Sequence, residues 1–462
     1  MLRFLKKEIG AILLIFVSLS IVSAHGQTVG PNVDITLGND TNSRQQVEPT
    51  IAVHPSNPNI IVAGAQDLRL LPQGGHRWHG YYRSTNGGQT WSVSLLPGFP
   101  GDTSPEGAAS PLRRFDLTSD PVLAFDRNGN VYYTGIAVKL DPQGNVRFSS
   151  LRAFVAKYSN DGATYVGVTM VQGSGADKPW IAVDTSAGPR DGYVYLVFDL
   201  SNVVFSRSTD GGRTFSRPQS VTGKTSSALP GVALDPAGNI FVSSLDGSLT
   251  LDEPLPRLRV SKSVDGGLTF NTVTVSSVTI LPSPLPGNGF RTFTIPQIAA
   301  DGNGAYVVWD DFRSGDSDVL FSRSTDSGTS WSLPARVNDV TLNHQFFPSV
   351  AATTGRISVI WYDSRLDDGG TIENLDVFYS QSMDGLAFTA SLRVTDMSFN
   401  PNLVQRTDPP GTSQTFMGDY IQVTANPTAV HAIWADNRNA CGNVDPVFGC
   451  VDQDVFAAAI VP

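Results

Sequence analysis

The chain has 462 residues, of which 42 are acidic and 32 basic, and its formal net charge at pH 7 is −10. A surface this acidic repels phosphate groups and argues against nucleic acid or an anionic membrane as a partner. Forty-four glycines and 30 prolines separate short runs rich in Val, Ile, Phe and Tyr, without a convincing amphipathic helical pattern. This composition predicts an all-β chain.

Residues 1–26 have the build of a secretory signal peptide. A basic start with Arg3, Lys6 and Lys7 precedes an apolar run over 9–23 and a small-residue cleavage site at 22–24. The run is shorter than the roughly 20 residues that a membrane-spanning helix needs. No cysteine follows it to carry a lipid anchor. We therefore expect 27–462 to form one soluble, monomeric domain that is secreted to the periplasm or the cell exterior.

A short string rich in Ser, Asp and Gly, closed by an aromatic residue in each copy, occurs six times. Successive copies begin 49–75 residues apart, a loosely kept period that is typical of a β-propeller or another repeat array. The copies lie at 84–91, 159–165, 208–215, 263–270, 324–331 and 382–388.

Seven apolar segments of similar sequence predict the innermost strands of seven blades. Alanine fills the fourth position in six of them, as expected where strands converge on a propeller axis and space is short. Second and third strands follow each segment, and the repeated string lies between the third strand and the fourth. The segments occupy 49–53, 121–125, 179–183, 230–234, 296–300, 348–352 and 419–423.

The seventh unit has no repeated string and no fourth strand. Residues 32–40 resemble the outer strands predicted at 335–341 and 392–398. We expect this N-terminal segment to pair with the final strand, which closes the ring and leaves no sheet edge open. The sequence therefore predicts an all-β, seven-bladed propeller of four-stranded antiparallel blades, with six blades as the alternative.

The repeated string has a structural task at each blade. Its aspartate, such as Asp210, can accept hydrogen bonds from backbone N–H groups of its own turn. Its glycines supply the positive φ that a tight hairpin needs, and its closing aromatic residue can pack between blades. Since six copies cannot form one active site, we interpret the string as part of the scaffold.

These strings resemble the Asp-box, also called the bacterial neuraminidase repeat, of sialidase-like propellers, and the resemblance covers nearly all of 27–462. It implies a secreted carbohydrate-active protein, acting as an exo-glycosidase of the sialidase type. A sialidase uses a tyrosine nucleophile, a partner glutamate and an aspartate acid/base. The positions that fit are Tyr420, Glu48, and Asp120 or Asp67.

The chain departs from the sialidase pattern at several points. The Arg-Ile-Pro motif is missing, because Thr294 stands in the arginine position of the nearest string at 293–297. Sialidases have six blades, whereas seven are counted here. The alternative is a non-catalytic propeller that binds a glycan or a protein.

Charged residues gather just before the inner-strand segments, where the axial funnel is expected. Glu48, Asp120 and Lys178 precede the first three segments, and Leu229, Ile295 and Phe347 precede the fourth to sixth. This combination of charged groups and an apolar arc suits a sugar-binding site, although ion pairs that only satisfy strand ends would have the same composition. Further ligand-binding candidates close to the segments are Asp177, Arg291, His344 and Asp419.

Three blades share the pattern Trp-x-Asp-x-Arg, which contains Arg313, Arg365 and Arg438. Sialidases bind the substrate carboxylate with three arginines, so the resemblance implies a ligand-binding role. Each arginine also follows its own aspartate, and an Arg–Asp pair that braces a loop explains the pattern with fewer assumptions. Ca²⁺ in these aspartate-rich loops is a further alternative, but their spacing is not that of a defined calcium loop. We therefore expect no cofactor and no metal site.

Cys441 and Cys450 are the only cysteines. In an oxidising compartment they would close a short loop, which contributes about 2.7 kcal/mol on the chain-entropy estimate. A metal pair is the competing interpretation, but no further Cys or His lies nearby. We predict a disulfide.

Overall fold

A computed structural model describes most of the chain. The described residues are 26–36, 45–71, 75–223, 226–247, 255–353, 355–404, 415–441, 444–445, 449–450 and 452–462. The predicted signal peptide lies outside these residues except for Gly26. No helix in the described part is long and apolar enough to cross a membrane.

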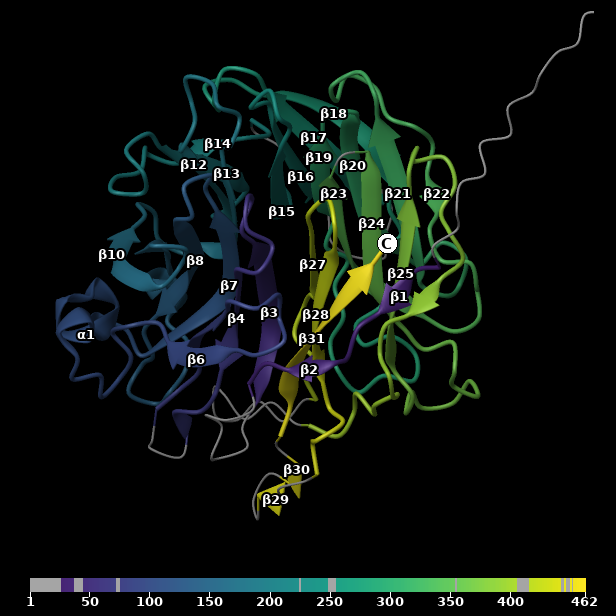
Figure 1. The fold of residues 1–462 in the computed structure, drawn as a ribbon, viewed down its shortest axis with the longest axis horizontal. Coiled ribbons are helices and arrows are strands. Elements are labelled where there is room, and N and C mark those ends of the chain that lie inside the picture. The colour runs from purple at the N-terminus through teal and green to yellow at the C-terminus, as the bar shows by residue number, and fades with distance from the viewer. Residues whose placement is uncertain are drawn as a thin grey trace, which may run out of the picture.

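Seven antiparallel sheets form a ring of blades around a central axis, and Figure 1 shows it from the side, with most strands upright. This confirms the prediction of seven four-stranded blades. The first three blades contain β3 (Gln46–Val53), β4 (Ile61–Asp67), β5 (Trp78–Ser84) and β6 (Ser92–Leu95); β7 (Leu117–Phe125), β8 (Val131–Val138), β9 (Arg152–Ser159) and β10 (Thr164–Met170); and β11 (Asp177–Val183), β12 (Val194–Asp199), β13 (Val203–Ser208) and β14 (Gln219–Ser220).

The remaining blades repeat this order. Blades four to six contain β15 (Ser227–Leu234), β16 (Ile240–Asp246), β17 (Arg257–Ser263) and β18 (Asn271–Ser277); β19 (Gln297–Asp301), β20 (Gly304–Asp311), β21 (Asp318–Ser324) and β22 (Ala335–Arg336); and β23 (Gln345–Thr353), β24 (Arg356–Asp363), β25 (Asp376–Ser382) and β26 (Leu392–Arg393). The seventh blade contains β27 (Gln422–Ala425), β28 (Val430–Asp436) and β31 (Asp454–Val461).

Short elements interrupt the connections between strands. They are α1 (Pro105–Ala109), the 3₁₀ turns η2 (Pro111–Arg114) and η3 (Phe148–Ser150), and a hairpin of β29 (Val444–Asp445) and β30 (Gly449–Cys450). Cys441 and Cys450 form the predicted disulfide beside this hairpin.

The two ends of the chain complete the seventh blade. β1 (Thr28–Val29) and β2 (Val33–Asp34) both pair antiparallel with β31. In Figure 1 these purple strands lie against the yellow C-terminal strand. The predicted closure by an N-terminal strand is confirmed, although the pairing begins earlier than expected, at Thr28, and is split into two short segments. Ring closure therefore depends on contacts between residues more than 400 positions apart in the sequence.

Five of the seven inner strands begin with an irregular step. The strand register shifts near the start of β3, β7, β11, β15 and β23. At each shift one non-glycine residue has a left-handed backbone, which is uncommon and re-aims the side chain. These residues are Glu48, Asp120, Lys178, Leu229 and Phe347, with φ between 47° and 59°. They are five of the positions that the sequence places at the funnel.

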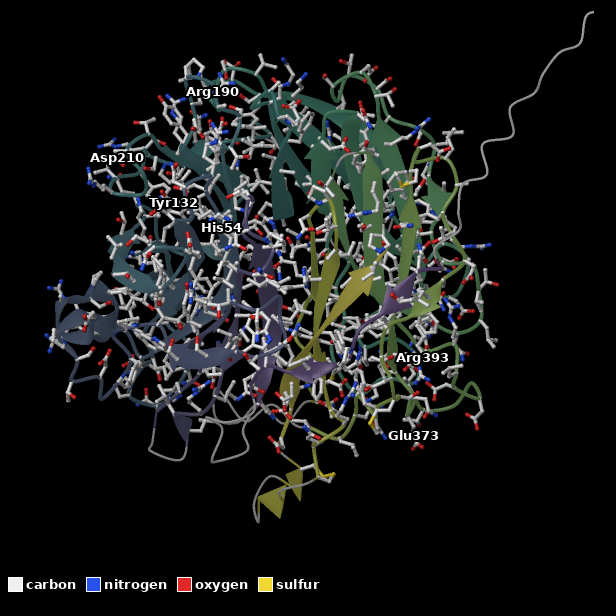
Figure 2. The ribbon with its side chains drawn as sticks, viewed as in Figure 1. His54, Tyr132, Arg190, Asp210, Glu373 and Arg393 are labelled. Carbon is white, nitrogen blue, oxygen red and sulfur yellow. A yellow bond between two sulfur atoms is a disulfide. The ribbon has the colours of Figure 1, made fainter. Side chains whose placement is uncertain are left out.

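The repeated strings form the turns that end the third strands, as predicted. In one of them the side chain of Asp210 accepts hydrogen bonds from Ser208 Oγ at 2.7 Å, from Thr214 N at 2.9 Å and from Thr214 Oγ1 at 2.6 Å. Asn86 accepts the equivalent bond from the backbone of Thr90 in the first blade. Figure 2 shows Asp210 at the edge of the molecule and Glu373, in the β24–β25 connection, toward the other end. The turns hold strands together at a distance from the axis.

Candidate functional site

A cavity of about 420 Å³ opens where the inner strands begin. It brings together five of the predicted ligand-binding or catalytic residues: Asp120, Asp177, Lys178, Arg291 and Asp419. Leu229, Ile295, Phe148 and Phe293 supply apolar wall, and Arg77 and Asp199 supply further charge. The cavity volume lies in the range that small-molecule sites occupy.

Asp120 and Asp177 form a carboxyl pair in the wall of this cavity. Their side chains are hydrogen bonded to each other. The backbone N–H of Lys178 lies 3.1 Å from Asp120 Oδ2 and 3.0 Å from Asp177 Oδ1, and Ser119 Oγ donates to Asp120 Oδ1 at 2.9 Å. The left-handed backbone at Asp120 and Lys178 makes this approach possible.

The two carboxyl groups titrate at different pH values. Burial raises the pKa of Asp177 to about 7, with the negative charge of Asp120 as the second cause. Burial also opposes ionisation of Asp120, but the Lys178 ammonium and the hydrogen bond from Ser119 outweigh it and lower the pKa of Asp120. The pair therefore shares one proton near neutral pH, and that proton resides on Asp177.

Asp199 is a third carboxyl group of the cavity, and the sequence analysis missed it. It lies opposite Asp177 in the β11–β12 register. Its Oδ2 accepts a hydrogen bond from the backbone of Leu229 at 2.9 Å, and burial raises its pKa to about 7. A signal was present in the sequence. Other second strands also end in aspartate, but those aspartates pair with nearby arginines, whereas Ser201 occupies the arginine position here.

Glu48 lies behind the cavity wall with a side chain that is only 1% exposed. Gln66 Nε2 donates a hydrogen bond to its carboxyl group. Burial raises the pKa of Glu48 to about 8, and the charges of Asp419 and Asp120 add to this effect. Glu48 is therefore protonated at neutral pH, and it does not line the cavity.

Arg291 is fixed at the rim by a two-pronged ion pair. Its Nε lies 3.0 Å from Asp419 Oδ1 and its Nη2 lies 2.6 Å from Asp419 Oδ2. The guanidinium group also lies over the rings of Phe416 and Phe293, at 4.9 Å and 5.2 Å from their centres. The paired geometry holds the cation in place and leaves it part of its exposure, since 35% of the Arg291 side chain is accessible.

The surroundings of Tyr420 do not favour the nucleophilic role predicted for it. Its hydroxyl group is buried and donates a hydrogen bond to the carbonyl oxygen of Pro121 at 3.1 Å. Burial raises its pKa well above 10, as do the charges of Glu48 and Asp120, whereas a phenolate nucleophile needs the opposite. The ring supports Lys178 instead, with Nζ 4.1 Å from the ring centre.

The three arginines of the Trp-x-Asp-x-Arg pattern do not meet in the cavity. Each bonds to the aspartate two residues before it: Arg313 to Asp311 at 2.6 Å, Arg365 to Asp363 at 2.6 Å and Arg438 to Asp436 at 2.8 Å. Arg365 and Arg438 also lie over Phe378 and Phe456 of the next strand. The scaffold interpretation is supported, and the substrate-binding triad is not.

His344 also lies apart from the axial cavity. It lines a separate hollow of about 240 Å³ with Asp316 and Ser364. Its Nδ1 accepts from the backbone of Ser317 at 3.3 Å, and burial lowers its pKa. Within the residues that the structure describes, no group of three or more His, Cys, Asp or Glu is arranged to hold a metal ion.

No protein-family model matches the chain, and no curated protein sequence matches it. Among solved structures, a protein of unknown function from Dyadobacter fermentans superposes with a TM-score of 0.51 at 12% identity, over 95% of this chain and 99% of that one. The Hadza microbial sialidase Hz136 gives a TM-score of 0.44 at 13% identity, over 88% and 74% of the two chains. An α-L-arabinofuranosidase from Fusarium graminearum gives a TM-score of 0.48 at 15% identity, over 72% of this chain and 92% of that one. The first of these likenesses supports the propeller fold.

Proposed function

We propose that this chain is an exported propeller of the sialidase-like, Asp-box group that hydrolyses a terminal glycosidic bond in its axial cavity. The observation that carries the proposal is the Asp120–Asp177 pair, whose pKa values are pushed apart by their surroundings. Such a separation is how active sites assign one carboxyl group as acid and another as base. Export is supported by the predicted signal peptide and by the disulfide between Cys441 and Cys450.

Each carboxyl group has a defined task in the proposed reaction. Asp177 transfers its proton to the glycosidic oxygen as the bond from that oxygen to the anomeric carbon breaks. Because the two carboxyl groups are in contact, they cannot flank the sugar ring, so the water molecule adds to the anomeric carbon from the face that the leaving group has vacated. Asp120 accepts the proton that this water releases. The proton now on Asp120 can return to Asp177 through their hydrogen bond, which restores the starting state.

The rest of the cavity suits a sugar. Phe148 and Phe293 offer apolar surface for the C–H face of a ring, whereas Lys178 and Arg291 offer positive charge close to the hydroxyl or acidic substituents. Asp199 holds a second proton near neutral pH and can donate it in a hydrogen bond. Polar groups that converge inside an apolar wall are typical of small-ligand sites.

The proposal is tested by incubating the purified protein with a panel of aryl glycosides and oligosaccharides, including acidic ones, and measuring released sugar. We expect release from at least one class, and loss of release in Asp120→Asn with unchanged thermal unfolding. If the folded protein releases no sugar from any member, hydrolysis is excluded.

A second candidate is glycan binding without turnover in the same cavity. It is favoured by the engagement of Tyr420 with Pro121 and of three arginines with their own aspartates, so that these four residues do not form a sialidase-type constellation. Binding on a glycan array that is lost in Arg291→Ala, without any product, would distinguish this function from hydrolysis.

A further inference from the structure

At several of the interfaces between neighbouring blades, which we call seams, a cationic side chain of one blade contacts the next blade. It stands on the third strand, immediately before the repeated turn, and it donates a hydrogen bond to a backbone carbonyl of the turn in the following blade. The contacts run from Arg83 to the Asp161 carbonyl at 2.8 Å, from Lys157 to Gly211 at 3.0 Å, from Arg207 to Gly266 at 2.7 Å, and from Arg323 to Asp384. Lys262 occupies the same position of blade four and packs near Gly328 of the next turn.

In blades two to five the residue opposite the cation on the second strand is aromatic, whereas Val62 stands opposite Arg83 in the first blade. Tyr132 is the strand partner of Lys157, and the ammonium group lies 5.1 Å from the centre of its ring. Tyr195, Phe241 and Tyr306 hold the equivalent positions in blades three to five. Figure 2 labels Tyr132 near Asp210, whose turn receives Lys157. An aromatic face and a carbonyl oxygen together form a site for a cation.

The seam between the seventh blade and the first lacks this cation. In the seventh blade, Ala459 on β31 occupies the position of the cation, and His431 on β28 is its strand partner. The facing turn is that of the first blade, in which the backbone of Gly88 donates to Ser84 Oγ at 2.9 Å, as Gly212 donates to Ser208 in the third blade. The carbonyl that corresponds to Gly211 is therefore that of Gly87. Within the described part of the chain, this carbonyl accepts no hydrogen bond.

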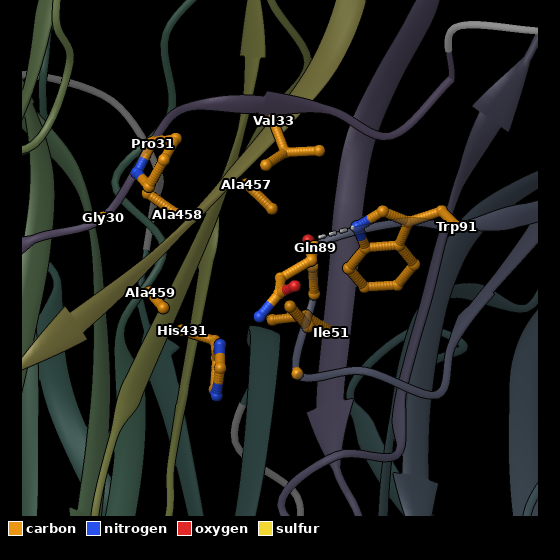
Figure 3. A pocket seen from close by; sticks show the side chains of 12 residues that line it. Gly30, Pro31, Val33, Ile51, Gln89, Trp91, His431, Ala457, Ala458 and Ala459 are labelled. Carbon is orange, nitrogen blue, oxygen red and sulfur yellow. Dashed lines mark hydrogen bonds between the residues drawn. The ribbon is translucent and has the colours of Figure 1, made fainter.

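A cavity of about 220 Å³ occupies the place of the missing side chain. Figure 3 shows His431 and Ala459 on one side of it, Trp91 on the other, and the closing segment at Pro31 and Val33 above. Trp91 is held by its own N–H, which donates to the Gly88 carbonyl at 3.0 Å. Ile51 and Gln89 complete the wall together with small residues, which are Gly30, Gly87, Gly88, Ala457 and Ala458.

His431 and Gln89 are the polar side chains that line this cavity, and of the two only His431 is buried. It is 6% exposed, lines the cavity, and makes no side-chain hydrogen bond to any described residue. Burial lowers its pKa to about 4, so the ring is uncharged at neutral pH and does not repel a cation. The His431 ring and the Gly87 carbonyl oxygen therefore both have hydrogen-bonding capacity that a ligand in the cavity can use.

We propose that this cavity binds the alkylguanidinium or alkylammonium group of a small ligand, which takes the place of the side chain that Ala459 lacks. The charged group donates to the Gly87 carbonyl and lies against the rings of His431 and Trp91. The alkyl portion occupies the space between Ala459 and the closing segment. Because the walls come from the first blade, the last blade and the N-terminal segment, the bound ligand also fastens the closure of the ring.

Butylguanidinium is the probe, and its neutral analogue butylurea is the matched control. We expect a saturable calorimetric signal and a change in Trp91 fluorescence with butylguanidinium, and neither with butylurea. At a concentration about 100-fold above the Kd, the probe should raise Tm by about 3 °C. The fluorescence change should be absent in Trp91→Phe. Equal responses to the two probes, or no response to either, would overturn the proposal.

Ala459→Arg supplies the missing cation within the chain. We expect it to raise Tm by about 2 °C and to abolish the response to butylguanidinium. Gln381→Arg is the control, because it adds an arginine at the equivalent position of the sixth blade, which faces a blade without a repeated turn. It should leave probe binding unchanged. If Ala459→Arg does not fold, Ala459→Lys replaces it. Probe binding that persists in a folded Ala459 variant with the added cation would place the ligand elsewhere and refute the assignment.

Discussion

The carboxyl groups of Asp120 and Asp177 are hydrogen bonded to each other, and one backbone N–H, that of Lys178, lies within 3.1 Å of both. The two residues come from neighbouring inner strands, β7 and β11, and their approach depends on the left-handed backbone at Asp120 and Lys178. The strained backbone of Asp120 and Lys178 therefore lies where two blades meet at the axis, and it brings two carboxyl groups close enough to share one proton.

Tyr420→Phe distinguishes a supporting tyrosine from a nucleophile. Removing the hydroxyl leaves the Pro121 carbonyl without its donor, so unfolding free energy should fall by about 1 kcal/mol, measured by urea denaturation. Hydrolysis, where present, should keep at least half its rate. Tyr133→Phe is the matched control. The Tyr133 hydroxyl donates a hydrogen bond of 2.8 Å to the Gly80 carbonyl, and Tyr133 does not line the cavity. A folded Tyr420→Phe protein without activity would restore the nucleophile assignment.

Arg365→Ala tests the scaffold interpretation of the Trp-x-Asp-x-Arg pattern. The change leaves Asp363 buried without its cation, so we expect a loss of about 3 kcal/mol in unfolding free energy. The Michaelis constant for an acidic substrate should stay within about twofold. Arg127→Ala is the control. It removes a more exposed ion pair with Asp191 and should lower the free energy of unfolding by less than about 1 kcal/mol. A large rise in the Michaelis constant with unchanged stability would instead indicate substrate contact.

Glu48→Gln tests the burial of a protonated acid near the axis. Folded Glu48 keeps its proton up to about pH 8, whereas its ordinary pKa is 4.5. The folded state therefore binds more protons between these values, and stability falls as pH rises through this window. We expect the Gln variant to lose less stability than the wild type between pH 5 and pH 9, followed by thermal unfolding.

Glu106→Gln, on the exposed first turn of α1, should follow the wild-type profile across this range. Parallel stability profiles for Glu48→Gln and the wild type would show that Glu48 ionises normally in the folded protein.

Asp210→Ala tests the repeated turns. The change removes the acceptor for Ser208 and for both the backbone and the hydroxyl of Thr214, so we expect the free energy of unfolding to fall by about 1–2 kcal/mol. Asp210→Asn should lose less, since Asn86 makes the equivalent bond to Thr90 in the first blade. Urea denaturation of the two variants measures the difference, and equal losses would argue against the hydrogen-bonding role.

The repeats explain why the fold could be predicted from the sequence. The strings recur six times and the inner-strand segments seven times, so the unmatched segment at 32–40 could be assigned to the open edge of the seventh blade. Periodicity assigns residues such as Asp120 and Lys178 to the axis because it places the start of each inner strand. The blade count therefore required no knowledge of side-chain contacts.

The roles of the axial residues could not be obtained in this way. The residue before a proline ordinarily adopts extended backbone, so the left-handed conformation of Asp120 before Pro121 was not predictable. Tyr420 was expected to face the cavity, but its ring packs against Lys178 and Trp180. Asp199 was missed because no repeated pattern marks it: it ends a second strand, and Ser201 stands two residues later, where four other blades have an arginine.

The most direct test of the proposed chemistry is the pH dependence of kcat/KM for wild type and Asp177→Asn on a substrate found in the glycan panel. Asp177 must hold its proton to act as the acid, and its pKa is about 7, so wild-type kcat/KM should fall above that pH. Asp177→Asn should reduce kcat/KM by about 10²- to 10⁴-fold while its thermal unfolding stays within a few degrees. A variant that retains wild-type kcat/KM, with the same fall above pH 7, would contradict the assignment of the proton to Asp177.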